Sequence, residues 1–264
     1  MPELPEVETY KRYVDSTALN QVIEKVTITD ERIVRDGAPG TIRARLKGAM
    51  IESTERRGKH LFCKLSNGGW LALHFGMTGD LAYYKGPKEP PKYARLILDF
   101  ENEYHLAYTS MRMFGGVRFV EDMDAFVRQQ RIGLDALSDQ LDLARFRELM
   151  NGRKGIIKPT LMDQSIIAGI GNIYADEILF QAGVHPEARV DGLDGARLGA
   201  IHRAMKRVLR VAVKRNAEIE KLPPSYLLPR RYKGPVDCPR CGGRIETKKI
   251  AGRTAYLCLN CQKK

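Results

Sequence analysis

Long apolar runs are missing from this sequence of 264 residues. A transmembrane helix needs about 18 or more consecutive apolar residues, and no such run occurs. The opening residues, MPELPEVE, are acidic and lack the apolar core of a signal peptide. No internal repeat is present. We therefore expect a cytoplasmic protein that has no secretion signal and no membrane partner.

Cysteine and acidic residues are both in short supply. Only five cysteines occur, and four of them fall within residues 238–264. The fifth, Cys63, lies in an apolar stretch, where a free thiol usually packs as a buried residue of a strand. Asp and Glu number 32 against 44 Lys and Arg, which gives a net charge of +12. This surplus favours a polyanionic partner, although a merely soluble basic protein is the alternative.

Hydrophobic residues make up 43% of the chain, which is enough for a packed core. Val7, Tyr10 and Val14 recur at helical spacing and predict an amphipathic helix from residue 3 to about 17. From about 22 to 120 the pattern changes to short strands separated by Gly and Pro, which favours a β-sandwich. Strands are expected at 70–74, 94–100 and 117–120.

The pattern becomes helical from about residue 135. Helices are expected near 143–150, 173–181 and 194–215. The last of these has one apolar face and one basic face. The basic face carries Arg203, Lys206, Arg207, Arg210, Lys214 and Arg215. Such a face is usually exposed to solvent, and direct contact with nucleic acid is the less common alternative.

The four clustered cysteines form two Cys-x-x-Cys pairs, Cys238 with Cys241 and Cys258 with Cys261, separated by 16 residues. This spacing is typical of a four-cysteine zinc ribbon, in which a hairpin brings the second pair back to the first. Two disulfides are the alternative, but an intracellular setting disfavours them. Because four thiolates leave no open coordination position, we expect one structural Zn²⁺.

Pro2 follows the initiator methionine, and removal of Met1 would expose a secondary amine. An α-amino group titrates near neutrality, so much of it is unprotonated and nucleophilic at neutral pH. Glu3 and Glu6 are close enough in sequence to handle protons at such a site. Many chains begin Met-Pro without any such role, so Pro2 alone is weak evidence.

Several motifs that follow Pro2 in a fixed order along the chain support a functional role for it. PELPEVE at 2–8 is followed by RRGKHL at 56–61, HFGMTG at 74–79, RMFG at 112–115, KPTLMD at 158–163 and GIGNIYA at 169–175. Together with the cysteine hairpin that carries Arg253, they resemble the family of formamidopyrimidine-DNA glycosylases and endonuclease VIII over essentially the full chain. The Glu-Leu-Pro opening is nearer the formamidopyrimidine branch.

The resemblance implies an α+β fold in four parts. These are an N-terminal catalytic β-sandwich domain with an N-terminal helix (1–133), a helix–two-turns–helix DNA-binding domain (134–222), a linker and lesion-side loop (223–235) and a four-cysteine zinc finger built on a ribbon hairpin (236–264). The implied partner is damaged double-stranded DNA, bound by a monomer associated with the bacterial nucleoid.

The resemblance also implies catalytic roles. Pro2 would be the Schiff-base nucleophile, Glu3 would assist ring opening and base loss, and Glu6 would support that site. Lys59 would serve in β-elimination. Arg253 would assist δ-elimination and hold phosphate, which agrees with the need for cations where phosphates leave.

A second implied set of residues binds DNA. Asn172 and the backbone of its glycine-rich turn would grip a phosphate beside the lesion, since glycines let N–H groups approach an anion. His74 and Lys154 would be further phosphate contacts. Met77, Arg112 and Phe114 would fill the gap that a flipped base leaves. The alternative for Met77 and Phe114 is that both are ordinary core side chains.

Three segments depart from the family pattern. Ser110-Met-Arg-Met113 replaces Asp-Pro-Arg-Arg, and Tyr93-Ala-Arg95 replaces His-Asp-His. Residues 219–233 lack the Gly-rich loop that caps 8-oxoguanine in related enzymes. We expect the excision chemistry to survive these changes and the choice of lesion to be affected.

The implied function is that of a bifunctional DNA glycosylase and AP lyase of base excision repair, which removes oxidised or ring-opened purines and cuts the strand by β,δ-elimination. One alternative is an oxidised-pyrimidine glycosylase of endonuclease VIII character, which the missing capping loop allows. The other is a non-catalytic protein that binds damaged DNA, which the presence of Pro2, Glu3 and Lys59 disfavours.

Overall fold

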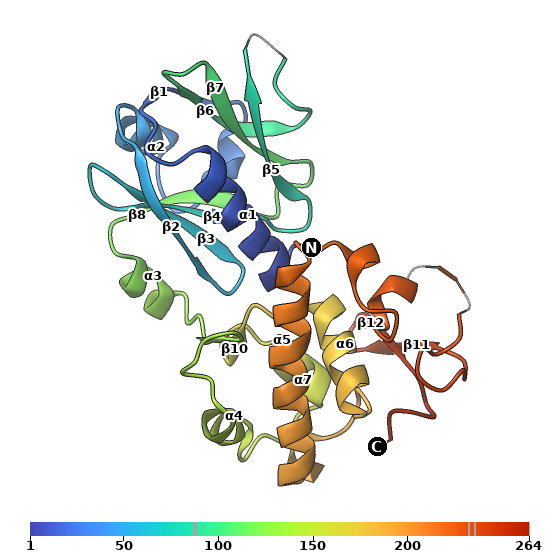
Figure 1. The fold of residues 1–264 in the computed structure, drawn as a ribbon. Helices are drawn as coiled ribbons and strands as arrows, with labels where there is room; N and C mark the ends of the chain where they lie inside the picture. The colour runs from blue at the N-terminus through green and yellow to red at the C-terminus, as the bar shows by residue number, and fades with distance from the viewer. Residues whose placement is uncertain (87–88, 232, 235, 264) are drawn as a thin grey trace. The chain divides into compact units, whose positions relative to one another are not determined.

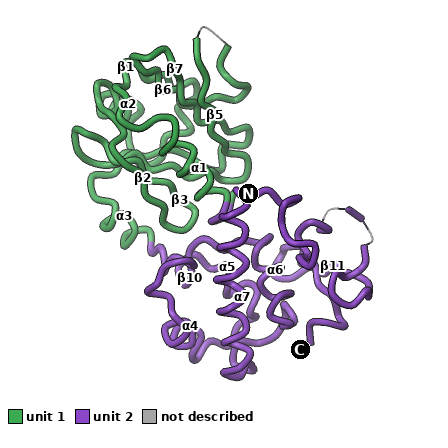
Figure 2. The backbone as a smooth tube through the Cα atoms, in the orientation of Figure 1, with its two compact units in different colours: residues 1–2, 6–130 green, residues 3–5, 131–264 purple. Residues whose placement is uncertain are grey.

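The protein forms two compact units (Figures 1 and 2) in a computed structural model that describes residues 1–86, 89–231, 233–234 and 236–263. The first unit comprises Met1–Pro2 and Glu6–Gln130, and the second comprises Glu3–Pro5 and Arg131–Lys264. Among the described residues, no helix has the length and apolar character needed to cross a membrane.

The first unit contains most of helix α1 and two four-stranded antiparallel sheets, which confirms the expected N-terminal sheet domain. α1 spans Leu4–Thr17. One sheet has the order β1 (Ile23–Ile28), β6 (Ala94–Phe100), β7 (Tyr104–Ser110), β5 (Gly79–Lys85). The other has the order β2 (Ile51–Arg57), β3 (His60–Leu65), β4 (Trp70–His74), β8 (Gly116–Val120).

One buried cluster joins both sheets to α1. Val7 and Val14 of the helix pack in it with Leu73 of one sheet and Leu98 of the other. Burial of each such side chain contributes about 1.5–3 kcal/mol. Cys63 belongs to the same cluster and is fully buried, as expected, and burial raises the pKa of its thiol to about 12.

Three short helical segments lie among or after the strands, and none of them was predicted from the sequence. They are the 3-10 helix η1 (Glu31–Ile33), α2 (Pro39–Leu46) and α3 (Met123–Gln129). In α2 only Ile42 and Leu46 are buried. Two buried positions spaced i, i+4 among Gly and Arg give too weak a periodicity for detection from sequence. The proline at its first turn, however, is a favoured helix start.

The second unit is mainly helical, as expected, and ends in the zinc-finger hairpin. Its helices are α4 (Leu143–Met150), α5 (Ile157–Met162), α6 (Asn172–Ala182) and α7 (Gly195–Lys214). Short 3-10 turns lie between α6 and α7 at η2 (Val190–Gly192) and after α7 at η3 (Ile219–Lys221) and η4 (Leu228–Arg230). β9 (Leu134–Asp135) pairs in parallel with β10 (Ile167–Ala168), and β11 (Glu246–Ile250) forms the hairpin with β12 (Arg253–Leu257).

Helix α7 starts and packs as its sequence predicts, with one exception on the basic face. Asp194 caps it by accepting a hydrogen bond from the Arg197 N–H. Its apolar face is buried in the core of the second unit. Lys206 is buried as well, and its Nζ donates to the Ser138 carbonyl at 2.6 Å. The expectation of a uniformly exposed basic face is therefore wrong for Lys206, since its long side chain reaches a carbonyl of a neighbouring loop.

The segment between α7 and the hairpin is folded rather than extended. Tyr226, Leu227 and Leu228 are buried. The Leu228 N–H donates to Glu177 Oε2 of α6 at 2.8 Å. Residues 226–228 and Arg231 of the expected linker are therefore buried, while residues 232 and 235 of that linker lie outside the described residues.

Candidate active site and nucleic-acid interface

Glu3 is held by the first turn of α6. Its carboxylate accepts hydrogen bonds from the N–H groups of Gly171 at 2.6 Å, Ile173 at 2.9 Å and Tyr174 at 3.3 Å. The positive end of a helix dipole stabilises an anion at this place. Only glycine fits at position 171, because a Cβ there would lie 2.4 Å from the Glu3 Cδ. These three N–H groups thus hold a carboxylate of this chain and are not available to a phosphate.

Pro2 directly precedes Glu3 and is joined to it by the peptide bond. Glu3 is only 2% exposed, whereas Pro2 is half-buried and can meet a ligand. The Leu4 N–H donates to the Gly169 carbonyl at 3.0 Å, so the chain is anchored on the other side of Glu3 too. Glu6 follows in the first turn of α1 and is half-buried. An amine at Pro2 would therefore belong to the residue that directly precedes an anchored carboxylate in the chain.

Arg253 is exposed at the start of β12, next to a residue that contacts Asn172. Asn172 Nδ2 donates to the Thr254 carbonyl at 3.1 Å. Its Oδ1 is buried and accepts no hydrogen bond within the described part of the chain. The structure therefore brings two predicted site residues, Asn172 and Arg253, to adjoining positions of the second unit.

Lys59 and His74 lie near each other in the first unit. Lys59 is buried at the turn of the β2–β3 hairpin, where Gly58 has φ +58°. Burial lowers the pKa of His74 to about 4, with the charges of Lys59 and Arg118 acting in the same direction. His74 pairs across the strands with His60, the ring centroids being 4.8 Å apart. His74 is consequently neutral at pH 7 and offers one N–H donor rather than a positive charge.

Met77, Arg112 and Phe114 are exposed on two adjoining loops of the first unit. Met77 is 44% and Phe114 60% exposed, so neither is a core residue. The Arg112 N–H donates to Thr78 Oγ1 at 3.0 Å, and the Arg112 guanidinium lies 4.8 Å from the Phe114 ring centroid. The loops touch through their glycines, because a Cβ on Gly76 would meet the backbone that follows Phe114.

The loop that carries Arg112 is braced by groups that the sequence did not indicate. Ser110 Oγ accepts from the Met113 N–H at 3.1 Å and so closes the turn over residues 110–113. Arg35 donates to the carbonyls of Met113 at 2.6 Å and Gly115 at 3.1 Å. No local motif marks Arg35, since it lies about 80 residues from its partners.

Two of the departures from the family pattern meet in space. The Ser110 N–H donates to the Tyr93 carbonyl at 3.0 Å, and Arg95 Nε donates to the Ser110 carbonyl at 2.9 Å. Tyr93 is 40% exposed beside this contact. The replaced His-Asp-His and Asp-Pro-Arg-Arg positions thus form one connected patch at the base of the Arg112 loop.

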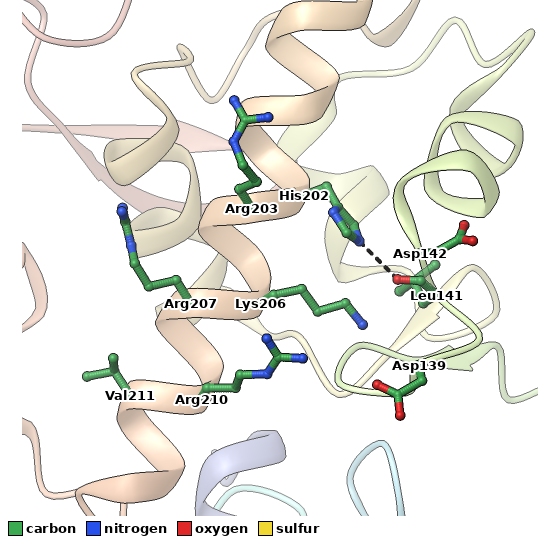
Figure 3. A pocket seen from close by; sticks show the side chains of 9 residues that line it. All are labelled: Asp139, Leu141, Asp142, His202, Arg203, Lys206, Arg207, Arg210 and Val211. Carbon is green, nitrogen blue, oxygen red and sulfur yellow. Dashed lines mark hydrogen bonds between the residues drawn. The ribbon is translucent and has the colours of Figure 1, made fainter.

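The basic face of α7 borders a cavity of about 600 Å³ (Figure 3). Arg203, Lys206, Arg207 and Arg210 line it from the helix, and Asp139 and Asp142 line it from the opposite loop. The acidic wall offsets part of the positive charge. Lys154, the other predicted phosphate contact of this unit, is exposed in the segment 151–156.

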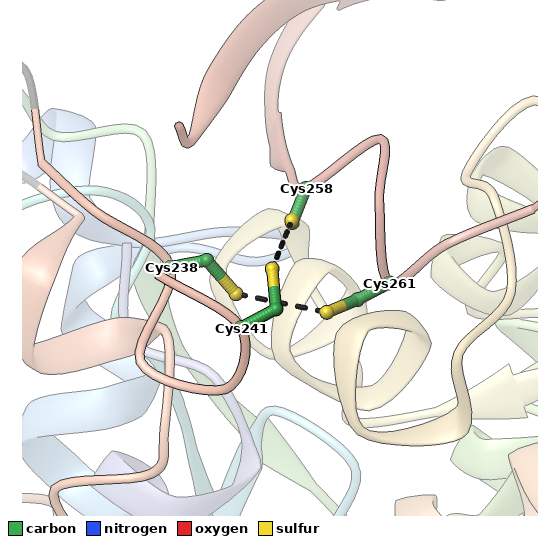
Figure 4. A group of neighbouring side chains, drawn as sticks. All are labelled: Cys238, Cys241, Cys258 and Cys261. Carbon is green, nitrogen blue, oxygen red and sulfur yellow. Dashed lines mark hydrogen bonds between the residues drawn. The ribbon is translucent and has the colours of Figure 1, made fainter. Parts of the chain in front are cut away.

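The four cysteines of the hairpin converge on one point (Figure 4). Their Sγ atoms all lie within 4.8 Å of one another, with Cys238–Cys261 at 3.8 Å and Cys241–Cys258 at 3.5 Å. A tetrahedral Zn²⁺ with Zn–S bonds of about 2.3 Å has S–S edges of about 3.8 Å. All four are free thiols, so the two-disulfide alternative is wrong.

Backbone N–H groups around this cluster donate hydrogen bonds to the cysteine sulfurs. The N–H groups of Arg240 and Gly243 point to Cys238 Sγ and Cys241 Sγ, each at 3.4 Å. Hydrogen bonds from the Gly243 N–H and from the neighbouring thiols lower the pKa of the Cys241 thiol to about 7. Such donors favour the thiolate that binds zinc. The donor set and its geometry fit one structural zinc ion.

Fold and site together define an α+β protein with an N-terminal sheet unit, a helical unit and a zinc-finger hairpin. The chain matches the sequence models of the formamidopyrimidine-DNA glycosylase N-terminal domain over residues 1–117, of the H2TH domain of the same enzymes over 132–223, and of the zinc finger found in FPG and IleRS over 238–264. The chain belongs to the formamidopyrimidine-DNA glycosylase family. It is a DNA glycosylase of base excision repair, with the AP lyase activity that is standard for this family.

Similar proteins cover the whole chain. Formamidopyrimidine-DNA glycosylase of Pelotomaculum thermopropionicum is 31% identical over 276 residues, covering 100% of this chain and 99% of the relative. That of Streptococcus pyogenes is 33% identical over 280 residues, with coverages of 100% and 99%. The Lactococcus lactis enzyme non-covalently bound to AP-site DNA has a TM-score of 0.90 at 28% identity, covering 99% of this chain and 100% of that one. A Lactococcus lactis mutant with Fapy-dG DNA also gives 0.90, at 29% identity and full coverage of both chains.

Proposed function

We propose that this protein removes oxidised or ring-opened purines from damaged double-stranded DNA, with Pro2 as nucleophile, and then cuts the strand. The observation that carries the proposal is the environment of Glu3, the residue that follows Pro2. Its buried carboxylate is held by three N–H groups at the start of α6. The names of the relatives and the DNA in the similar solved structures support this substrate class.

The chemistry follows from a secondary amine. The Pro2 nitrogen attacks C1′ of the damaged nucleotide, the C1′–N bond breaks, and the base leaves with the electron pair and takes up a proton. The sugar ring opens at O4′, which is protonated, and an iminium joins Pro2 to C1′. Glu3 would assist these proton movements, and Glu6 would support the same site.

Strand cutting uses the iminium as an electron sink. Loss of a C2′ proton expels the 3′ phosphate from C3′, which is β-elimination, and Lys59 is the proposed base. Loss of a C4′ proton then expels the 5′ phosphate from C5′, which is δ-elimination, and Arg253 stabilises the departing charge. Water hydrolyses the iminium at the end and frees Pro2.

The DNA would be bound by a monomer in the cytoplasm, at the nucleoid. Asn172, His74 and Lys154 are the proposed phosphate contacts. Met77, Arg112 and Phe114 would occupy the gap left by the flipped base, which is consistent with their exposure on adjoining loops. The high positive charge suits this polyanion and predicts binding that weakens steeply with salt.

Borohydride reduction on a duplex with a single abasic site tests the nucleophile. The wild-type protein should form a covalent adduct with DNA through its N-terminal residue, identified by mass spectrometry. Pro2→Gly should lower adduct formation strongly, and Glu3→Gln should lose base excision while keeping lyase activity on a preformed abasic site. An undiminished adduct in Pro2→Gly would refute the assignment. A panel of purine and pyrimidine lesions, with excision rates compared, decides the substrate class.

A further inference from the structure

Three buried charged side chains lie together in the second unit, outside the site described above. Lys158 of α5, Asp176 of α6 and Arg231 after η4 are 1%, 1% and 2% exposed. Lys158 Nζ lies 2.7 Å from Asp176 Oδ1, and Arg231 Nη1 pairs with Asp176 Oδ2. Removing ions from water costs several kcal/mol for each ion, and well-packed apolar side chains are often at least as stabilising. The cluster therefore calls for an explanation other than stability.

The cluster binds the backbone of strand β12. Lys158 Nζ and Arg231 Nη2 donate to the Thr254 carbonyl at 3.3 and 3.4 Å. Asp176 Oδ2 accepts from the Tyr256 N–H at 3.1 Å. The Arg231 guanidinium also lies over the Tyr256 ring, 4.3 Å from its centroid. Two peptide groups of β12 are thus fixed by the same three side chains.

Thr254 directly follows Arg253, and its carbonyl has a third donor in Asn172 Nδ2 at 3.1 Å. A carbonyl oxygen has two lone pairs, so three donors more than satisfy it. Asn172 and Asp176 lie one turn apart on α6 and both hold β12. The backbone of the same first turn holds Glu3. Helix α6 is therefore the common support of Glu3 and of the strand that begins with Arg253.

We propose that Lys158, Asp176 and Arg231 are positioning residues, which fix Arg253 relative to Glu3 for the δ-elimination step. The inference rests on the role proposed for Arg253. The Arg253 side chain is exposed, so its reach toward a phosphate depends on where the backbone places it. A misplacement of about 1 Å can lower a rate by about 100-fold.

The charges of the cluster are consistent with this role. Burial lowers the pKa of Lys158, while the carboxylates of Asp176 and Glu3 raise it. Lys158 thus interacts with two carboxylates of the same unit, whereas the Arg231 charge opposes its protonation. Neutralising Asp176 would leave Lys158 and Arg231 without their shared carboxylate and would weaken the hold of the cluster on β12.

The test compares the successive steps on one abasic-site duplex. In Asp176→Asn and Lys158→Met, the rates of borohydride-trapped adduct formation and of β-elimination should stay within about twofold of wild type. The rate of δ-elimination should fall about 10- to 100-fold, so that the β-product accumulates. Arg231→Lys, which keeps a cation beside Asp176, should recover part of the δ-elimination rate that Arg231→Met loses. Lys206→Met removes a buried cation that does not touch β12 and should leave the product ratio unchanged.

Arg253→Ala is measured in parallel and separates the two hypotheses. If it leaves the ratio of δ- to β-product at the wild-type value, the proposed role of Arg253 fails, and the inference with it. If it lowers the ratio but the cluster variants do not, only the inference is overturned. Equal loss of trapping, β-elimination and δ-elimination in the cluster variants would also overturn it, because that pattern indicates general destabilisation. Arg231→Lys decides the question should the Met variants fail to fold.

Discussion

Glu177 should make the protein less stable as the pH rises through the weakly acidic range. This carboxyl lies on α6, is fully buried, and accepts hydrogen bonds from the Leu228 N–H and Gln181 Nε2, each at 2.8 Å. Burial raises its pKa from 4.5 to about 7, against the opposing effect of these hydrogen bonds. The folded chain therefore keeps a proton that the unfolded chain has already lost.

The sign and size follow from proton linkage. Below about pH 4.5 the carboxyl is protonated in both states, so its ionisation contributes nothing. Between about pH 4.5 and 7 only the unfolded chain ionises, and the free energy of unfolding falls as the pH rises. The difference between the two pKa values corresponds to about 3 kcal/mol, reached above pH 7.

Glu177→Gln mimics the protonated carboxyl at every pH. Urea unfolding followed by far-UV circular dichroism should show the variant gaining about 3 kcal/mol relative to wild type between pH 4.5 and 7.5. Glu148→Gln is the matched control, because Glu148 is 66% exposed and pairs with Arg145 at the surface. A difference between Glu177→Gln and wild type that does not change with pH would refute the reasoning.

Three shorter predictions concern the site itself. Gly171→Ala should lower the rate of base excision more than tenfold, because the added Cβ would displace the Glu3 carboxylate. Gly192→Ala is the control and should excise at the wild-type rate, because no atom of the described residues beyond its chain neighbours lies within 4 Å of its Cβ. Equal rates in the two variants would contradict the contact between Gly171 and Glu3. Metal analysis should find one zinc per chain, and Cys258→Ser should lose zinc together with DNA affinity; full affinity without zinc would oppose a structural role. Arg112→Ala should weaken preference for the base opposite the lesion, measured by excision from duplexes that differ only at that base, and an unchanged preference would count against this position.

Sequence alone determined those features that depend on local spacing. Two Cys-x-x-Cys pairs predict a tetrahedral zinc site without knowledge of the tertiary structure, because a tight turn is enough to bring the two thiolates of each pair together. The alternation of apolar and basic residues over 194–215 predicts α7 and its buried face in the same way. The ordered motifs around Pro2, Lys59 and Asn172 gave the family, and with it the chemistry.

The tertiary structure decided which groups those residues meet. Glu3 and Gly171 are 168 residues apart. No local sequence pattern therefore predicts that the N–H groups at the start of α6 bind the Glu3 carboxylate. The sequence does not distinguish Lys206 from its exposed basic neighbours. Its burial follows from the hydrogen bond that its Nζ donates to the Ser138 carbonyl of a loop distant in sequence. Arg231, in a segment without a family motif, pairs with Asp176 only because the chain folds back onto α6. Such contacts depend on three-dimensional packing between distant segments, whereas periodicity and motif spacing report only what lies within a few residues.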